Sequence, residues 1–147
     1  MVSLAVVIVI VDQYTKWLIE QARPSMTVIP GFFNLTYARN TGAAFGILQG
    51  KQTLLTVVSV IAIGILVFLL WYERPERRGF LVALALILGG TCGNFIDRVR
   101  QGYVVDFLDV YISRYHWPSF NVADSAITVG VGLLIIVTFL EERKQNP

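Results

Sequence analysis

The stretch Gly89–Arg98, GGTCGNFIDR, closes an apolar run and brings an amide, a carboxylate and a guanidinium to its end. On a helix, Asn94, Asp97 and Arg98 share one face, because they are three and four residues apart. Polar groups at such a place cost free energy unless they face a partner, water or a substrate. A second polar group, Phe120–Asp124 (FNVAD), opens the next apolar run. We therefore expect these two helix ends to meet.

Composition indicates an integral membrane protein. The 147 residues are 55% hydrophobic and only 15% charged, with a mean hydropathy of +0.64, whereas about a quarter of the residues of a soluble domain are charged. The net charge of +2 is too small to indicate a nucleic-acid partner. The single cysteine, Cys92, excludes an internal disulfide and a multi-cysteine metal cluster, and we predict no metal or cofactor.

The apolar runs predict an all-α integral membrane fold of four transmembrane helices with a small extracytoplasmic β-sheet or flap, in one domain over 1–147. A cleavable signal peptide fits the first run poorly, because no basic residue precedes it. Phe32–Ala38 has strand composition, whereas Asp106 and Asp109 are expected in a solvated loop. The predicted helices lie at about 1–20, 53–72, 79–96 and 124–140, and the extracytoplasmic segments at about 21–52 and 97–123.

Basic residues predict the orientation. The loop Glu73–Arg78 (ERPERR) holds three arginines, and Arg143 and Lys144 follow the last apolar run. With four helices these two segments lie on one side, which the positive-inside rule makes cytoplasmic. Both longer polar segments then lie on the opposite face, so Asp97 and Asp124 reach the same membrane surface.

Two carboxylates at one surface have a defined chemistry. At a separation of about 4 Å they repel by roughly 4 kcal/mol at an effective dielectric near 20, so the pair holds one proton. The ionised member activates a water and the protonated member supplies a proton, as in aspartic proteases. Helix dipoles favour the anion at Asp124, near a helix start, and disfavour it at Asp97, near a helix end. We expect Asp124 to be the base and Asp97 the acid.

Simpler structural roles compete with these assignments. Asn121-x-x-Asp124 resembles a helix-capping arrangement. Asp12 and Lys16 have the i, i+4 spacing of an ion pair. Asp97 would equally pair with a basic residue at the interface, and the two glycines of the GxxxG pattern within Gly89–Arg98 are typical of a helix-packing face.

Five short motifs of this chain, in their order along the sequence, resemble those of the lipoprotein signal peptidase (signal peptidase II) family. The members of that family are integral-membrane aspartic proteases. The matching motifs are Asp12–Lys16 (DQYTK), Asn40–Phe45 (NTGAAF), Gly89–Arg98, Val105–Phe107 (VDF) and Phe120–Ser125 (FNVADS).

The resemblance implies that Asp97 and Asp124 form the catalytic dyad. It implies a protein of the bacterial cytoplasmic (inner) membrane, with both termini cytoplasmic and the site on the extracytoplasmic side. A monomer is the default expectation. The reaction removes signal peptides from diacylglyceryl-modified prolipoproteins, with cleavage before the lipid-modified cysteine, at the surface of membrane lipid. Asp12 and Lys16 would shape the site from the first helix. The positions expected to bind substrate or support the dyad are Asn40, Gly42, Asn94, Arg98, Asp106 and Asn121.

Two other classes of function remain open at the level of the sequence. One is a small transporter or proton-conducting bundle that uses Asp12, Asp97 and Asp124 as relay groups. The other is a non-catalytic assembly protein that packs through its glycine-rich helices.

Overall fold

The computed structural model describes residues 1–43, 47–72 and 77–145, with side chains described as far as 143. All four of its helices are long and apolar enough to cross a membrane, which confirms the predicted membrane architecture. The turn expected in the ERPERR loop, at 73–76, and residues 44–46 of the NTGAAF motif lie outside the described residues. The helices are α1 (Val2–Ala22), α2 (Gln52–Tyr72), α3 (Arg78–Gln101) and α4 (Val122–Gln145).

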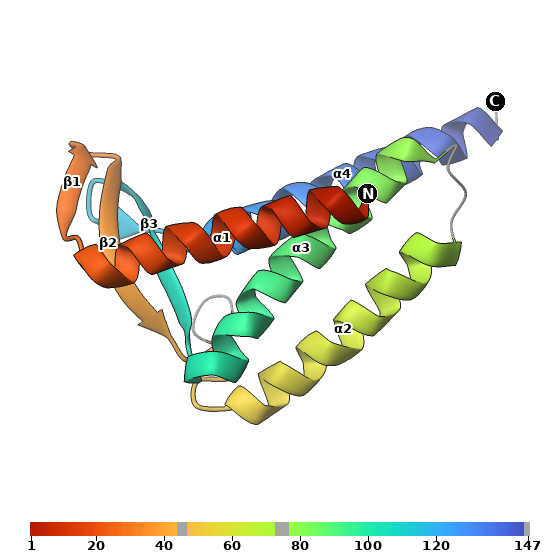
Figure 1. Ribbon diagram of the computed structural model, residues 1–147. Helices are drawn as coiled ribbons and strands as arrows, with labels where there is room; N and C mark the ends of the chain where they lie inside the picture. Colours follow the sequence, from red (N-terminus) through yellow and green to blue (C-terminus); the bar gives the residue numbers. More distant parts are fainter. Residues whose placement is uncertain (44–46, 73–76, 146–147) are drawn as a thin grey trace.

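Helix α3 lies at the centre of the bundle and contacts each of the other three helices (Figure 1). Its glycines permit these contacts. A Cβ atom on Gly89 would lie 2.8 Å from Cβ of Ile8 on α1, and one on Gly90 would strike the carbonyl oxygen of Ala123 on α4. The glycine pattern is therefore a packing face, as predicted.

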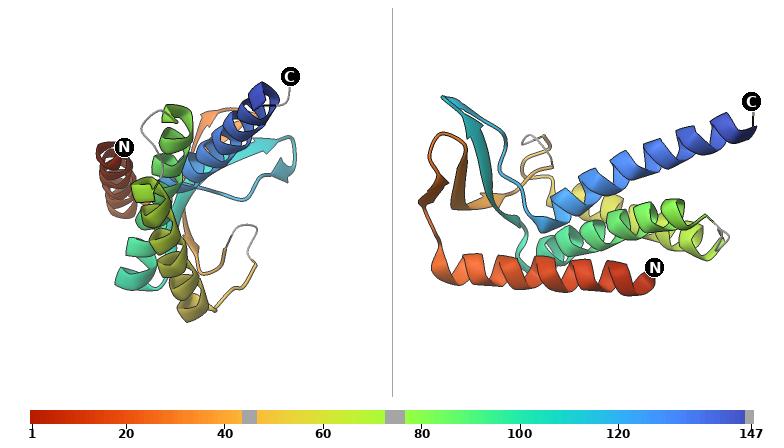
Figure 2. Two further views of the ribbon diagram at one scale, coloured as in Figure 1. Left: turned by 90° about the vertical axis from the view of Figure 1, so that its right-hand side faces the viewer. Right: turned by 90° about the horizontal axis from the view of Figure 1, so that it is seen from above.

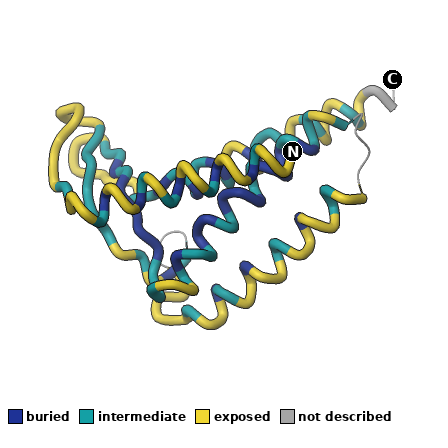
Figure 3. Tube along the Cα trace, viewed as in Figure 1, coloured by how far each residue is buried: buried dark blue, intermediate teal, exposed yellow. Residues whose placement is uncertain are grey.

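Burial follows the same arrangement (Figure 3). Ala83, Leu84 and Ala85 of α3 are almost fully buried, whereas most of α2 is exposed, as expected of a surface that faces lipid. Trp71 and Tyr72 are highly exposed at the end of α2, where aromatic side chains mark a membrane interface.

A four-stranded antiparallel sheet joins the two polar segments, and its order is β1-β2-β3-β4. It lies at the end of α1 remote from the N-terminus (Figure 1) and projects sideways from the bundle (Figure 2). Strand β2 pairs with β3 so that Ala38 faces Asp106. Both polar segments therefore lie at the same end of the bundle, as helix parity required. The strands are β1 (Met26–Ile29), β2 (Phe33–Asn40), β3 (Val104–Ile112) and β4 (Tyr115–His116).

Two expectations about these segments need correction. The strand expected at Phe32–Ala38 is present as β2, but the solvated loop expected around Asp106 and Asp109 is wrong. Both aspartates lie on β3, with 3% and 7% of their surface exposed. The reason is tertiary, because β3 is an inner strand, paired with β2 on one side and bonded to Phe120 on the other.

The helix ends also differ from the sequence-based bounds. Helix α3 continues to Gln101 and ends at Gly102, whose left-handed φ of 77° terminates the helix. Helix α4 begins at Val122, so Asp124 lies in its first turn. Asp97 therefore lies inside α3, one turn before the helix ends. The polar side chains near the end of α3 and the start of α4 come together beside the sheet.

Candidate active site

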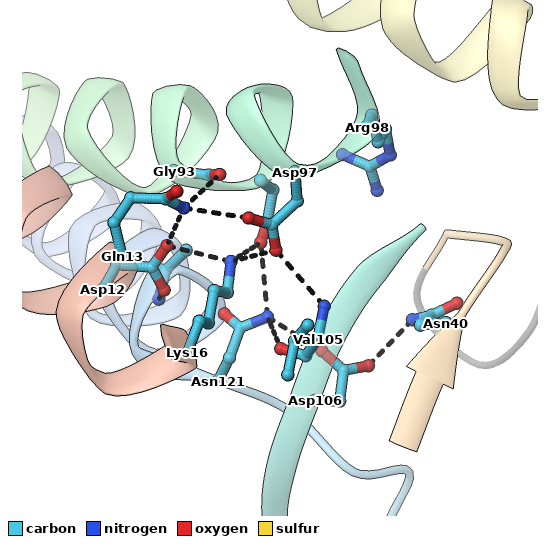
Figure 4. Close-up of polar contacts among 12 residues, drawn as sticks. Asp12, Gln13, Lys16, Asn40, Gly93, Asp97, Arg98, Val105, Asp106 and Asn121 are labelled. Carbon is cyan, nitrogen blue, oxygen red and sulfur yellow. Dashed lines mark hydrogen bonds and ion pairs between the residues drawn. The ribbon is translucent and has the colours of Figure 1, made fainter. Parts of the chain in front are cut away.

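A buried lysine ties α1 to α3. The ammonium of Lys16, 2% exposed, lies 2.8 Å from Oδ2 of Asp12 and 3.0 Å from Oδ2 of Asp97. It also donates to Oδ1 of Asn94 at 2.9 Å. These three partners match the three donors of an ammonium group. The predicted Asp12–Lys16 ion pair is therefore present (Figure 4), but it is part of a larger network.

The orientation of the Asn94 amide follows from this lysine. Its Oδ1 accepts from Lys16, so its Nδ2 points the other way and donates to Oδ1 of Asp124 at 2.7 Å. Oδ2 of Asp124 accepts from the backbone N–H of Asn121 at 3.2 Å. Two donors therefore face the Asp124 carboxylate, and both stabilise its ionised form.

Asn121 and Asp124 also form a capping box at the start of α4. The Asn121 side-chain oxygen accepts from the Asp124 backbone N–H at 2.9 Å, while the Asp124 carboxylate accepts from the Asn121 backbone N–H. The capping interpretation is confirmed, and it does not compete with a chemical role. The cap itself sets the direction of the Asp124 carboxylate.

A second carboxylate, Asp106, is held beside the first. Its Oδ1 accepts from Nδ2 of Asn121 at 2.8 Å and its Oδ2 from Nδ2 of Asn40 at 3.0 Å (Figure 4). Burial raises the pKa of Asp106 to about 7, and the charge of Asp124 adds to this rise, although the two amide hydrogen bonds oppose it. Asp106 is therefore a carboxyl group that exchanges its proton near neutral pH.

Arg98 supplies a positive charge and a hydrogen-bond donor to the same place. Its Nη2 lies 3.4 Å from the carbonyl oxygen of Gly42, and its buried Nε has no partner in the described structure. The backbone N–H of Gly42 donates to Oδ1 of Asn40 at 2.9 Å. The turn after β2 is thus fastened to α3 beside the carboxylates.

These groups border a cavity of about 910 Å³. Asp106, Asp124 and Arg98 line it, together with Asn94 and Asn40. It extends from the sheet down between the helices. Its apolar and hydroxyl lining on α2, α3 and α4 includes Ser59, Thr91, Ile127, Thr128 and Val129.

The surroundings of Asp97 differ from the expected ones. Its carboxylate accepts from Gln13 at 2.9 Å and from the backbone N–H of Val105 at 3.2 Å, in addition to its Lys16 contact (Figure 4). It is not among the described residues that line the cavity. The carboxylates that share the cavity wall are Asp106 and Asp124. The expected pairing of Asp97 with Asp124 stays a prediction.

Gln13 is a site residue that the sequence interpretation did not single out. Its side-chain amide bridges α1 to α3 by donating to Asp97 and, at 3.1 Å, to the carbonyl oxygen of Gly93. Its position directly after Asp12 was the available signal. The sequence also showed no sign of the part played by Ala123. Its backbone N–H donates to Oδ1 of Asp12 at 2.9 Å, a contact between residues far apart in the chain.

Helices long enough to cross a membrane and buried carboxylates beside a cavity are the features expected of a membrane-embedded enzyme. The sequence pattern of the family described as signal peptidase (SPase) II matches residues 4–140. The chain belongs to the signal peptidase II family.

Relatives and solved structures agree with that membership. The chain is 45% identical to the lipoprotein signal peptidase of Syntrophus aciditrophicus, covering 95% of this chain and 91% of the relative. It is 48% identical to that of Symbiobacterium thermophilum, covering 97% and 96%. A structure described as a bacterial membrane enzyme at 2.3 Å resolution shares 42% identity over 98% of this chain and 89% of its own, with a TM-score of 0.88. The transporter alternative is not favoured.

Proposed function

We propose that this chain, residues 1–147, is a monomeric aspartic endopeptidase of the bacterial cytoplasmic (inner) membrane that removes signal peptides from diacylglyceryl-modified prolipoproteins, cleaving before the lipid-modified cysteine. The observation that carries the proposal is the pair Asp106 and Asp124 on one wall of a cavity that continues between the helices. Membership of a family whose members are named lipoprotein signal peptidase supports the substrate class.

The two carboxylates take different roles in the proposed reaction. Asp124, held by Asn94 and the Asn121 backbone N–H, is the ionised group that accepts a proton from water. Asp106, with its pKa raised to about 7, is the protonated group that donates to the carbonyl oxygen of the scissile bond. The water oxygen attacks the carbonyl carbon and gives a gem-diol intermediate. Asp124 then gives the proton it took from water to the leaving nitrogen and the C–N bond breaks. Asp106 regains its proton from one hydroxyl of the diol as the carboxyl product forms.

The helix dipoles predict Asp97 as the acid, but its contacts support another part in this site. We propose that its carboxylate, together with Asp12, neutralises Lys16, and that Lys16 holds the Asn94 amide in the orientation that serves Asp124. A direct catalytic role for Asp97 stays a prediction, and the experiment below separates the two assignments.

The lower part of the cavity suits a substrate that arrives through lipid. Its walls on α2 and α4 are apolar or carry hydroxyls that donate back to their own helices, as Ser59 does to the Leu55 carbonyl at 2.9 Å. The buried Nε of Arg98 is a donor suited to a substrate backbone carbonyl. We propose that Asn40 and Gly42 contribute to the same binding surface, since they form the adjacent turn.

Orientation follows from charge. Arg77, Arg78 and Arg143 lie at helix ends remote from the sheet, at the end of the bundle where α1 begins and α4 ends (Figure 2). The positive-inside rule supports a cytoplasmic position for that end, with the sheet and the carboxylates on the extracytoplasmic side.

The test is cleavage of a purified diacylglyceryl-modified prolipoprotein by the full chain in detergent, followed as a gel shift. We expect cleavage by wild type and no cleavage by Asp106→Asn or Asp124→Asn. Asp97→Asn should leave slower but measurable cleavage, because Lys16 keeps its contacts with Asp12 and Asn94. Thermal unfolding of each variant shows that it is folded.

Two outcomes contradict parts of the proposal. Full cleavage by Asp106→Asn, with none by folded Asp97→Asn, would restore Asp97 as the partner of Asp124. Absence of cleavage by wild type, with retained binding of the prolipoprotein, would favour a non-catalytic assembly role.

A further inference from the structure

A group of arginines and tyrosines lies on the outside of the sheet, at the end of α1. The Arg39 guanidinium stacks over the Tyr103 ring at 4.8 Å and the Tyr37 ring at 5.8 Å, and its Nε donates to the Tyr37 hydroxyl at 2.9 Å. On the other side, Arg23 lies 5.5 Å from the centre of the Tyr37 ring. The cation–π contacts hold both guanidiniums in place without neutralising them.

One carboxylate and a third arginine complete the group. Glu20 accepts from the Tyr103 hydroxyl at 3.4 Å and lies 3.6 Å from the Arg100 guanidinium. The three arginines are exposed, so a single carboxylate leaves two uncompensated positive charges at the surface. We call this set the arginine–tyrosine cluster: Glu20, Arg23, Tyr37, Arg39, Arg100 and Tyr103.

The depth of the cluster can be read from α1. The rings of Tyr14 and Trp17 stack with their centres 6.1 Å apart and are exposed, as expected of aromatic side chains at a membrane interface. Arg23 follows Trp17 by six residues, which is about 9 Å along a helix at 1.5 Å per residue. The polar headgroup region of one leaflet is about 5–8 Å thick, so the cluster lies at its outer edge.

We propose that the arginine–tyrosine cluster binds the phosphate of an anionic phospholipid in the leaflet on the sheet side of the membrane. Guanidinium groups recognise phosphate oxygens through paired N–H donors, and the tyrosine rings hold Arg23 and Arg39 ready for this contact. The membrane-spanning helices already place lipid against the neighbouring surface, where Val99 and Leu18 are exposed.

This site is distinct from the proposed reaction centre but touches its edge. Tyr37 and Tyr103 pack against the buried cluster of Ile19, Val105 and Phe107, between the sheet and α1. Their neighbours in the sequence, Ala38 and Val104, line the cavity instead. Arg39 also borders the cavity. A bound lipid would therefore hold β2 against the bilayer surface beside the cavity mouth.

The experiment is native mass spectrometry of the full chain released from nanodiscs that contain equal amounts of phosphatidylglycerol and phosphatidylcholine. We expect wild type to retain phosphatidylglycerol about tenfold over phosphatidylcholine, because each arginine near a surface favours an anionic lipid several-fold. Arg39→Gln should lower this ratio about threefold, and the triple variant R23Q/R39Q/R100Q should bring it close to one.

Arg114→Gln is the matched control. Arg114 is an exposed arginine of the β3–β4 turn on the same sheet, so its substitution removes the same charge and should leave the ratio at the wild-type value. The proposal is overturned by a wild-type ratio near one, by a triple variant that keeps the wild-type ratio, or by an equal loss in Arg114→Gln. If thermal unfolding shows that the triple variant is not folded, the lipid ratios of Arg39→Gln and Arg114→Gln are compared instead, and equal ratios overturn the proposal.

Discussion

Replacing Lys16 by methionine tests the charge network under the site. Methionine keeps most of the aliphatic stem and removes the ammonium, which contacts Asp12 at 2.8 Å, Asp97 at 3.0 Å and Asn94 at 2.9 Å. The lysine side chain is 3% exposed, so water does not replace these contacts. Two buried carboxylates then lose their cation.

The magnitude follows from that loss. Removing one partner of a buried ion pair lowers the free energy of unfolding by about 3–5 kcal/mol, mainly because the remaining charge is left buried. Asp12 keeps the backbone N–H of Ala123, and Asp97 keeps that of Val105. These bonds limit the effect, so we expect a loss of about 4 kcal/mol for Lys16→Met.

The assay is equilibrium unfolding in mixed micelles by titration with a denaturing detergent, read by near-UV circular dichroism. The control is Lys51→Met, which removes an exposed lysine and should change the free energy of unfolding by less than about 0.5 kcal/mol. The double variant Lys16→Met/Asp97→Asn should be more stable than the sum of the single losses, by at least about 1 kcal/mol, because it removes an unpaired carboxylate together with its cation. A Lys16→Met loss no larger than that of Lys51→Met, or strict additivity in the double variant, would refute the reasoning.

Three further predictions concern the site and its supports. Burial raises the pKa of Asp106 to about 7, so the rate of cleavage should fall as pH rises through that value. The free energy of unfolding should also fall as pH rises from about 4 to 7, because only the folded state keeps the Asp106 proton in this range. Asp106→Asn should remove most of this pH dependence of stability. Gly90→Ala should lower the free energy of unfolding by about 1–3 kcal/mol, because its Cβ strikes the backbone carbonyl of Ala123, whereas Gly132→Ala, with open space around it, should be neutral or slightly stabilising. His116→Ala should raise KM several-fold and spare kcat, since His116 bonds Asp109 at 2.8 Å and steadies the hairpin that leads to the cavity; an unchanged KM would count against this role.

The site shows how structural and chemical roles combine in a few residues. Asn121 caps α4 through its side-chain oxygen and holds Asp106 through its side-chain nitrogen. Asn94 joins the lysine network to Asp124 in the same way. Because an amide has one accepting and one donating end, each asparagine transmits the position of one partner to the other.

The sequence by itself determined the membrane architecture and the family motifs. Helix length and hydropathy depend on residues close together in the chain, and helix parity alone placed the ends carrying Asp97 and Asp124 at one surface. The i, i+4 pair of Asp12 with Lys16, the glycine packing face and the cap at Asn121 were readable for the same reason.

Only the tertiary structure decided which carboxylates share the cavity. Helix parity placed Asp97 and Asp124 at one surface, but the Asp97 carboxylate is paired with Lys16 of α1. The polar composition of its segment predicted a solvated Asp106, but the pairing of β3 with β2 buries this side chain near Asp124. These contacts join residues far apart in the chain, so local spacing does not encode them, and the packing of α1, α3, α4 and the sheet sets them.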